Sequence, residues 1–232
     1  MRAGARAVVE AGSDGALCYR VLRSAAPLLL RPTADGLHLV GGAAGPLGGD
    51  DLSLDLEVGS GAALVVRTVA ASVALRGSPD QRASRQGSSE LRHVDAIFEQ
   101  CHSRFTVSAR LGPGASLRWL PEPGVAAAGC WHVTLSRLDL AASATAVWRD
   151  EVVMGRDGEQ PGAWSSSLSA DLAGNPLLRH CLSVGPGSPA WDGPAVVGRA
   201  RAVGSILVVG SPGVSLEGTS GGQLPSGHMA RE

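Results

Sequence analysis

Apolar and polar residues alternate along residues 52–58, and this pattern constrains the fold more than any other part of the sequence. Leu52, Leu54, Leu56 and Val58 are separated by Ser53, Asp55 and Glu57, which is the period-two pattern of a β-strand with one face in water. Residues 59–62, Gly-Ser-Gly-Ala, interrupt the pattern, and an aliphatic run resumes over residues 64–69. A short glycine-containing break between two such runs predicts a β-hairpin.

The same unit returns twice further along the chain. Residues 105–111 and 117–120 flank a Gly-Pro-Gly-Ala turn, and residues 138–140 and 147–153 flank an Ala-Ala-Ser-Ala turn. A recurring strand-turn-strand unit predicts stacked layers of strands. The 32 Gly and 14 Pro of the 232-residue chain also favour an all-β fold with many turns. We therefore expect one β-rich domain over residues 1–209.

Outside these units the pattern predicts a few more elements. Strands are expected over residues 7–10 and 17–22, on both sides of a firm turn at 174–176, and over 199–209. Residues 27–32 are apolar and bracketed by prolines, which predicts either a buried edge segment or an exposed docking strip. Residues 89–102 have apolar residues at helical spacing and are predicted to form a short helix. Residues 210–232 are rich in Gly and Ser and are predicted to be a disordered tail.

Charge and targeting signals exclude several classes of protein. The formal net charge is −1, with arginines and acids mixed along the chain, which argues against nucleic acid as the main partner. Residues 1–15 lack the apolar core of a signal peptide, and the longest apolar run, 206–209, is too short to cross a bilayer. The four cysteines are scattered, without the density of a disulfide-rich protein. These features predict a cytoplasmic protein.

Few residues form a recognisable catalytic or metal-binding motif. Ser220 stands in a G-x-S-x-G match, but that motif needs a strand-to-helix elbow, and none is predicted in the tail. Cys130 and His132 are two residues apart and can face the same side of a strand. A pair of ligands falls short of the four in a structural zinc site, so these residues are weak metal candidates and are better interpreted as a core thiol and imidazole.

The other polar residues of interest are Asp50, Asp51, Glu122, Glu151 and Arg156. Asp50 and Asp51 are predicted to cap a tight turn through bonds to the backbone, and Arg156 is predicted to pair with Glu151 or Glu159. Glu151 lies on a predicted strand between apolar neighbours. An acid that faces inward there needs a partner or a water-filled passage, and both interpretations stay open.

Four collinear stretches resemble one protein family. They are the GPLGGDxLxLxLxVGxGAxLxVRTxAA run that begins at residue 45, WLPEPxVxAAG at 119–129, the run at 148–159, and AGNPLLRH at 173–180. Together they are similar to the urease accessory protein UreD family, called UreH in some organisms. In the family, residues corresponding to 74 and 105 are nearly adjacent, so the resemblance implies that residues 78–104 are an insertion.

The resemblance implies a maturation chaperone that has no catalytic activity. Such a protein binds urease apoprotein and the accessory proteins UreF and UreG, and helps nickel reach the urease active site, with a water-filled internal tunnel as the proposed route. No cofactor is expected to be held tightly, because nickel is in transit. Glu151, Asp50 and Asp51 are then candidates for the nickel passage, and Gly48, Gly49 and Arg156 for a corner that is structural or contacts a partner. The implied fold is a β-helix-like stack of hairpin layers with one or two short helices.

Two other functions remain open from the sequence. One is a β-rich protein-binding module with no role in metal transfer, which the low charge and repeated hairpins favour. The other is a hydrolase that uses Ser220 or a Cys–His pair, which the missing triad order argues against.

Overall fold

All regular structure in the described residues is β-strand. A computed structural model describes residues 1–13, 15–77 and 102–210, and these ranges contain strands and turns but no helix. The predicted β-dominated class is therefore confirmed, whereas no short helix is found in this part of the chain. The helix expected over residues 89–102 and the tail expected over 210–232 lie outside the described residues, apart from their end residues His102 and Gly210.

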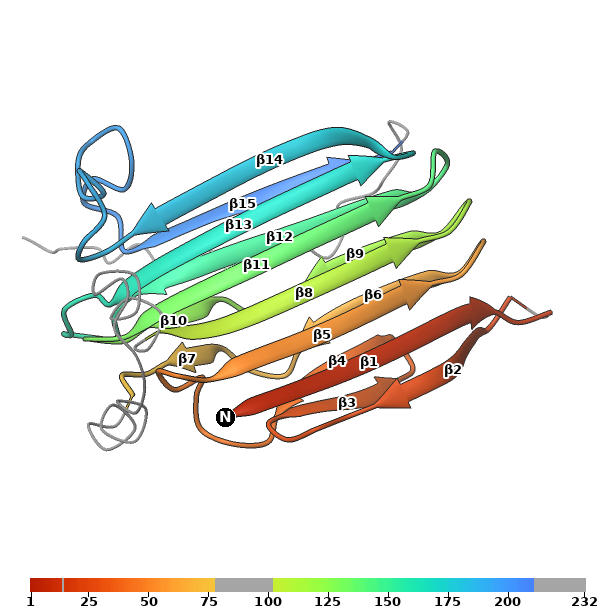
Figure 1. The fold of residues 1–232 in the computed structure, drawn as a ribbon, viewed down its shortest axis with the longest axis horizontal. Helices are drawn as coiled ribbons and strands as arrows, with labels where there is room; N and C mark the ends of the chain where they lie inside the picture. Colours follow the sequence, from red (N-terminus) through yellow and green to blue (C-terminus); the bar gives the residue numbers. More distant parts are fainter. Residues whose placement is uncertain (14, 78–101, 211–232) are drawn as a thin grey trace, which may run out of the picture.

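The strands form two sheets that face each other (Figure 1). Sheet A consists, in spatial order, of β14 (Asn175–Val184), β13 (Ala163–Leu172), β11 (Trp131–Leu140), β8 (Ser103–Leu111), β5 (Asp51–Val58), β1 (Arg2–Ala11) and β2 (Leu17–Arg23). Sheet B consists of β3 (Leu28–Thr33), β4 (Gly36–Gly41), β6 (Ala63–Thr68), β9 (Ser116–Leu120), β12 (Thr145–Met154), β10 (Gly124–Ala126) and β7 (Ser72–Ala74). β15 (Ala202–Val209) lies off this order and pairs with β12.

The predicted hairpins are wrong in their pairing. β5 and β6, β8 and β9, and β11 and β12 follow each other in the chain, but the members of each pair lie in opposite sheets. Each strand instead pairs in parallel with its counterpart in the next unit, so that β5 pairs with β8 and β8 with β11. The repeated small-residue turns are thus corners between the sheets. Alternation identifies the buried face of a strand but not its partner, so a corner and a hairpin look alike in the sequence.

The corners also stack on one another. The amide of Gly112 donates to the carbonyl of Val58 at 2.8 Å, and that of Ala141 donates to Leu111 at 3.0 Å. On the sheet B side, Ser116 donates to Ala62 and Thr145 to Ala115, each at 2.9 Å. Small residues suit this position because the backbones of successive corners approach closely.

Two antiparallel pairs are those that local turns predicted, whereas the antiparallel pairs β3–β4 and β12–β15 were not predicted. β1 pairs with β2, and β13 pairs with β14 across the turn at residues 173 and 174. β3 lies at the edge of sheet B with Leu28 and Leu30 buried, so the interpretation of residues 27–32 as a buried edge segment is confirmed. The strand expected over residues 199–209 is present as β15.

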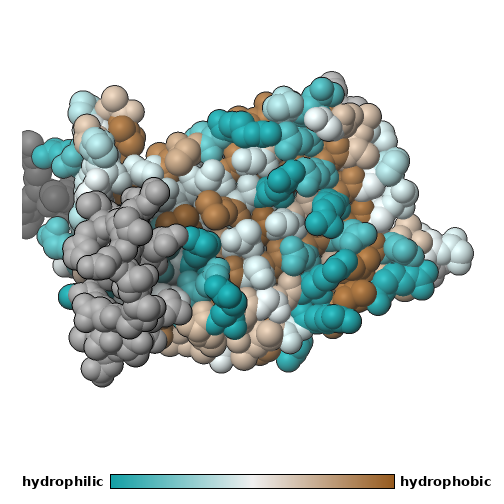
Figure 2. Space-filling model, viewed as in Figure 1, coloured by the Kyte–Doolittle hydropathy of each residue, from teal (hydrophilic) through white to brown (hydrophobic). Residues whose placement is uncertain are grey.

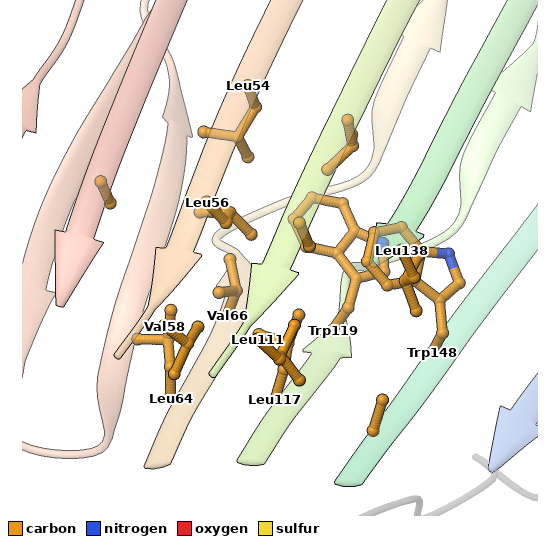
Figure 3. Packing of buried hydrophobic residues seen from close by; sticks show 14 of the residues in the cluster. Leu54, Leu56, Val58, Leu64, Val66, Leu111, Leu117, Trp119, Leu138 and Trp148 are labelled. Atoms are coloured by element: carbon orange, nitrogen blue, oxygen red, sulfur yellow. The ribbon is translucent and has the colours of Figure 1, made fainter. Parts of the chain in front are cut away.

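The core fills the space between the sheets with aliphatic residues and a pair of tryptophans. Leu52, Leu54, Leu56 and Val58 are all buried, as their alternation predicts. Trp119 of β9 and Trp148 of β12 stack with ring centroids 5.0 Å apart and an interplanar angle of 18° (Figure 3). Since aromatic residues make up only 3% of the chain, this stacked pair supplies an unusual share of the buried aromatic surface.

Sheet B is interrupted at two neighbouring positions, in each of which one strand ends and a second strand continues in the same row. β6 ends at Thr68 and β7 resumes at Ser72, while β9 ends at Leu120 and β10 resumes at Gly124. β12 runs past the interruption without a break, pairing with β9 up to Trp148 and with β10 from Val152 onward. Residues 149–151 of β12 therefore border a window in the sheet.

Within the described part of the chain, no helix is long and apolar enough to cross a bilayer.

Candidate functional site: a cavity behind the window in sheet B

A cavity of about 420 Å³ lies between the two sheets and reaches the window in sheet B. Its outer part is lined by residues of the interruption, among them Ala70, Pro121 and Glu122. Its inner wall is formed by side chains from both sheets, including Phe105 of β8 and Trp119 of β9. Gly124 is required at this wall, because a Cβ there would lie 2.4 Å from the ring of Trp164.

A row of polar side chains from β11 lines the cavity. His132, Thr134 and Ser136 are two residues apart along the strand, so all three face inward. Further along the same face, Leu138 and Leu140 belong to the apolar core. The cavity therefore lies where the inner face of sheet A changes from apolar to polar.

Asp150 is the carboxylate that faces this row from sheet B. It lies two residues after the buried Trp148 on β12 and lines the cavity. Burial raises the pKa of Asp150, and a hydrogen bond with the hydroxyl of Ser166 and the nearby His180 partly oppose that rise. A largely buried carboxylate with one hydroxyl partner is a poorly solvated charge, which a passing cation would stabilise.

His132 and Cys130 are buried and electrically neutral. His132 is 2% exposed, its Nδ1 lies 2.7 Å from the hydroxyl oxygen of Ser103, and its ring packs on Trp164 at 4.4 Å. Burial lowers the pKa of His132 to about 3 and raises that of Cys130 to about 11. Among the described residues no group of three His, Cys, Asp or Glu side chains is arranged to hold a metal ion. The pair therefore has the geometry of core residues.

Glu151 lies at the rim of the cavity rather than inside it. Its carboxylate is on the outer face of sheet B, 3.5 Å from Nε of Arg149, and its side chain is 38% exposed. The register between β12 and β15 is continuous from Ala146 to Val153, so the bulge that would turn Glu151 inward does not exist. Simple alternation from Trp148 selects Asp150 for the interior. Of the two partners predicted for Arg156, the structure shows Glu159 and not Glu151. The guanidinium of Arg156 lies 2.7 Å from a carboxylate oxygen of Glu159.

Replacing Glu151 by Ala is expected to reduce the free energy of unfolding by less than about 1 kcal/mol, because an ion pair this exposed contributes little. Urea denaturation of the two proteins measures the difference. Arg156→Ala, which removes a comparable exposed pair, is the matched control. A loss of 3 kcal/mol or more (roughly the cost of breaking a buried pair) would contradict this placement of Glu151.

The corner that contains Asp50 is held by backbone contacts. One carboxylate oxygen of Asp50 accepts from the amide of Leu47 at 2.9 Å, and the other lies 2.7 Å from the Met1 amine. Gly49 has φ +90 and Gly48 donates its amide to the carbonyl of Leu75 at 3.1 Å. Asp51 pairs with Arg2 at the surface at 3.2 Å. The predicted turn-capping role fits the side chain of Asp50. Asp51 takes part in the corner through its backbone and not through its carboxylate.

Sequence reasoning missed Asp150, Ser166 and Ser103. Asp150 could have been found by counting two residues from Trp148 along the strand. Ser103 and Ser166 carry no comparable signal, because their partners, His132 and Asp150, lie on other strands.

Comparison with known proteins identifies the family. The family model described as UreD urease accessory protein matches residues 3–225. The chain belongs to the UreD family. The protein named urease accessory protein UreD in Frankia casuarinae is 40% identical to this chain, and the match covers 97% of this chain and 77% of that relative. The protein of the same name in Parafrankia sp. is 41% identical, and the match covers 92% of this chain and 74% of that relative. The UreD protein of Streptomyces avermitilis is 37% identical over 90% of this chain and 77% of its own length. Membership of the UreD family gives the chain a role in urease maturation.

Proposed function

We propose that this protein is a non-catalytic, cytoplasmic chaperone of urease maturation that binds urease apoprotein, UreF and UreG, and lets nickel pass through the cavity behind the window in sheet B. The observation that carries this proposal is a partly polar cavity with a half-buried carboxylate, Asp150, that reaches the surface through an interruption of one sheet. Nickel is cargo here and not a resident cofactor.

The polar groups of the cavity suit transit better than storage. Asp150 offers a single carboxylate, while Thr134 and Ser136 offer neutral oxygens. A passage must bind an ion strongly enough to admit it and weakly enough to release it. Closed sets of four nitrogen and sulfur ligands, as in structural zinc sites, would trap a borderline-soft ion.

The carboxylates predicted from the sequence fit this route unequally. Glu151 and Glu122 lie at the window, where they would attract a divalent cation to the entrance. Asp50 is already satisfied by two donors and Asp51 is paired at the surface of sheet A, so their part in the passage stays a prediction. Whether Gly48, Gly49 and Arg156 contact a partner, in addition to their place in a corner, likewise stays a prediction.

Asp150→Asn is expected to lower the nickel content of urease several-fold while leaving its complex with urease and accessory proteins intact. The substitution removes the charge but keeps the shape of the side chain and a partner for Ser166. The test is to mature urease with wild-type or variant protein and to measure nickel per urease by atomic absorption. Asp157→Asn, an exposed acid in the turn after β12, is the matched control.

The same variant should not be less stable at neutral pH. Because the pKa of Asp150 is raised in the folded state, the stability that this group contributes is lost as the pH rises through the raised value. Asn does not titrate, so its advantage over Asp should grow from below the ordinary pKa of 3.8 toward neutral pH. Unchanged nickel loading by a stably folded Asp150→Asn that still binds its partners would favour the alternative, a binding module without a metal role.

A further inference from the structure

The ionisable side chains that line the cavity behind the window are acidic or neutral. They are Asp150, Glu122 and Glu151 together with His132, which is neutral because burial lowers its pKa to about 3. Among the described residues of the wall there is no arginine. An ion pair with Arg149 balances Glu151, whereas no ion pair joins Asp150 or Glu122 to another described residue. The cavity therefore carries negative charge that its own wall does not neutralise.

Asp150 is the acid of this group that faces the interior. It lies between Trp148 and Val152 on the inner face of β12, and both of those residues are buried. The hydroxyl of Ser166 donates a hydrogen bond to its carboxylate and His180 lies nearby, but neither forms an ion pair with it. A half-buried carboxylate against an apolar wall is stabilised by a cation that comes to lie beside it.

Aromatic residues are concentrated around the same cavity. They make up only 3% of the chain, yet three of its five tryptophans and one of its two phenylalanines line the cavity. The tryptophans are Trp119, Trp148 and Trp164. Trp148 stacks on Trp119 and precedes Asp150 by two residues on the same face of β12. Indole rings attract cations through the negative charge of their faces and bury hydrocarbon through their area, so this wall suits a ligand that offers both.

Most of the remaining wall is aliphatic, and it is already formed. It includes Leu28, Leu39, Leu52 and Val107. The ring of Trp164 lies against Gly124, where a Cβ would be 2.4 Å away, and packs on His132 with ring centroids 4.4 Å apart. A metal ion can bind only the polar groups of such a wall, whereas a hydrocarbon stem also uses the apolar part. The volume of about 420 Å³ is typical of small-molecule sites, which span roughly 300–1,000 Å³.

The outer face of sheet A has a different distribution of charge. A hollow of about 100 Å³ on this face is lined by Arg6 and Arg110 as well as by Asp55 and Glu57, and Arg6 pairs with Glu57 at 3.1 Å. Figure 2 views the molecule from this side and shows hydrophilic residues spread along the strands. Charges of both signs lie together here, so this hollow lacks both the aromatic wall and the uncompensated negative charge of the cavity.

We propose that the cavity binds an organic cation with an apolar stem, of the alkylammonium or alkylguanidinium class, with its charged group at Asp150 and its stem against the tryptophans. This inference goes beyond the proposed function. A free amine and a Lys or Arg side chain of a partner that enters through the window present the same chemistry. Either ligand would occupy the carboxylate that nickel uses, so a chain with the cation bound would be closed to the metal.

The test is a titration of the full chain with n-butylammonium and with n-butanol, which has a similar shape but no charge. Tryptophan fluorescence and calorimetry report binding. The wild type is expected to bind n-butylammonium at least about tenfold more tightly than n-butanol, because a desolvated cation gains from both the indole rings and the carboxylate. Equal affinities would show an apolar cavity without selectivity for charge and would overturn the proposal, and this comparison depends on no variant.

Variants locate the bound cation. Asp150→Asn should weaken n-butylammonium binding at least about tenfold and leave n-butanol binding unchanged, which also shows that the variant is folded. Asp157→Asn, which removes an exposed acid, is the matched control. The fluorescence response should fall in Trp164→Phe and persist in Trp131→Phe, whose position lies outside the cavity. Undiminished binding of n-butylammonium by Asp150→Asn would overturn the proposal.

A third probe, lysine blocked as its Nα-acetyl amide, distinguishes the two sources of the ligand. Binding at least as tight as that of n-butylammonium supports the side chain of a protein partner, because the blocked backbone must then be accommodated at the window. Binding of n-butylammonium without binding of the blocked lysine supports a free amine. Failure of both cations to bind would overturn the proposal. These measurements use neither nickel nor urease, so their failure would leave the proposed function standing.

Discussion

Replacement of His132 by Asn is expected to remove a large part of the acid sensitivity of this fold. In the folded protein the pKa of His132 is lowered by burial to about 3, against an ordinary value of 6.5. Such a group contributes stability that is fully present above its ordinary pKa and is lost as the pH falls through the folded value. The difference corresponds to about 4–5 kcal/mol lost between pH 6.5 and pH 3.

Asn is the suitable replacement because its side-chain amide can take the place of Nδ1, the atom that contacts Ser103. Its free energy of unfolding, measured in urea at several pH values between about 7 and about 3, should fall less steeply than that of the wild type. Val107→Ala, a core truncation on β8 without a titratable group, is the control. It should lower stability by a similar amount at every pH. Parallel pH profiles for wild type and His132→Asn would refute the prediction.

Truncation of Trp148 to Ala is expected to lower the free energy of unfolding by about 3–5 kcal/mol, which is typical of a buried aromatic residue. Trp148 is 1% exposed and stacks on Trp119. Its removal therefore loses both the buried area and the ring contact, which adds roughly 1 kcal/mol in comparable pairs. Most of the remaining core consists of aliphatic residues on the inner faces of both sheets, and these cannot move far enough to fill the space.

Two further variants test whether the loss of stability comes from the buried, stacked ring of Trp148. Trp148→Phe keeps an aromatic ring against Trp119 and should lose less than half as much stability. Trp131→Ala removes an indole that is 37% exposed at the outer end of β11 and should cost less than about 1 kcal/mol. Urea midpoints and slopes of the four proteins provide the comparison. Equal losses for Trp148→Ala and Trp131→Ala would show that the stacked pair does not hold the sheets together.

The sequence predicted which faces of the strands are buried, and it failed on how the strands pair. Leu54 and Leu56 were predicted to face inward because alternation depends on the backbone of a single strand. Parallel pairing of β5 with β8 depends on residues separated by roughly fifty positions, and no local pattern specifies it. The recurrence of Gly-Ser-Gly-Ala and Gly-Pro-Gly-Ala at the same place in successive units is the available hint, since corners that stack need small residues.

The candidate site shows the same division. The apolar neighbours of Glu151 make it a candidate for an inward position, but it lies at the rim of the cavity because the strand has no bulge. Asp150 follows from the alternation that also places Trp148 inside. The cavity itself could not be predicted, because it depends on two interruptions in neighbouring strands that meet only in the folded sheet.

The parallel arrangement has a consequence for how the chain can fold during synthesis. β5 finds β1 already made, β8 then finds β5, and β11 finds β8, so each new segment adds to a growing edge as it leaves the ribosome. β12 differs in the direction of its next neighbour, because the strand on its far side, Ala202–Val209, is antiparallel to it and is made about fifty residues later. During that interval the backbone edge of β12 is open to other chains. An early partner at this edge would therefore protect the strand that carries Asp150 from mispairing until β15 is made.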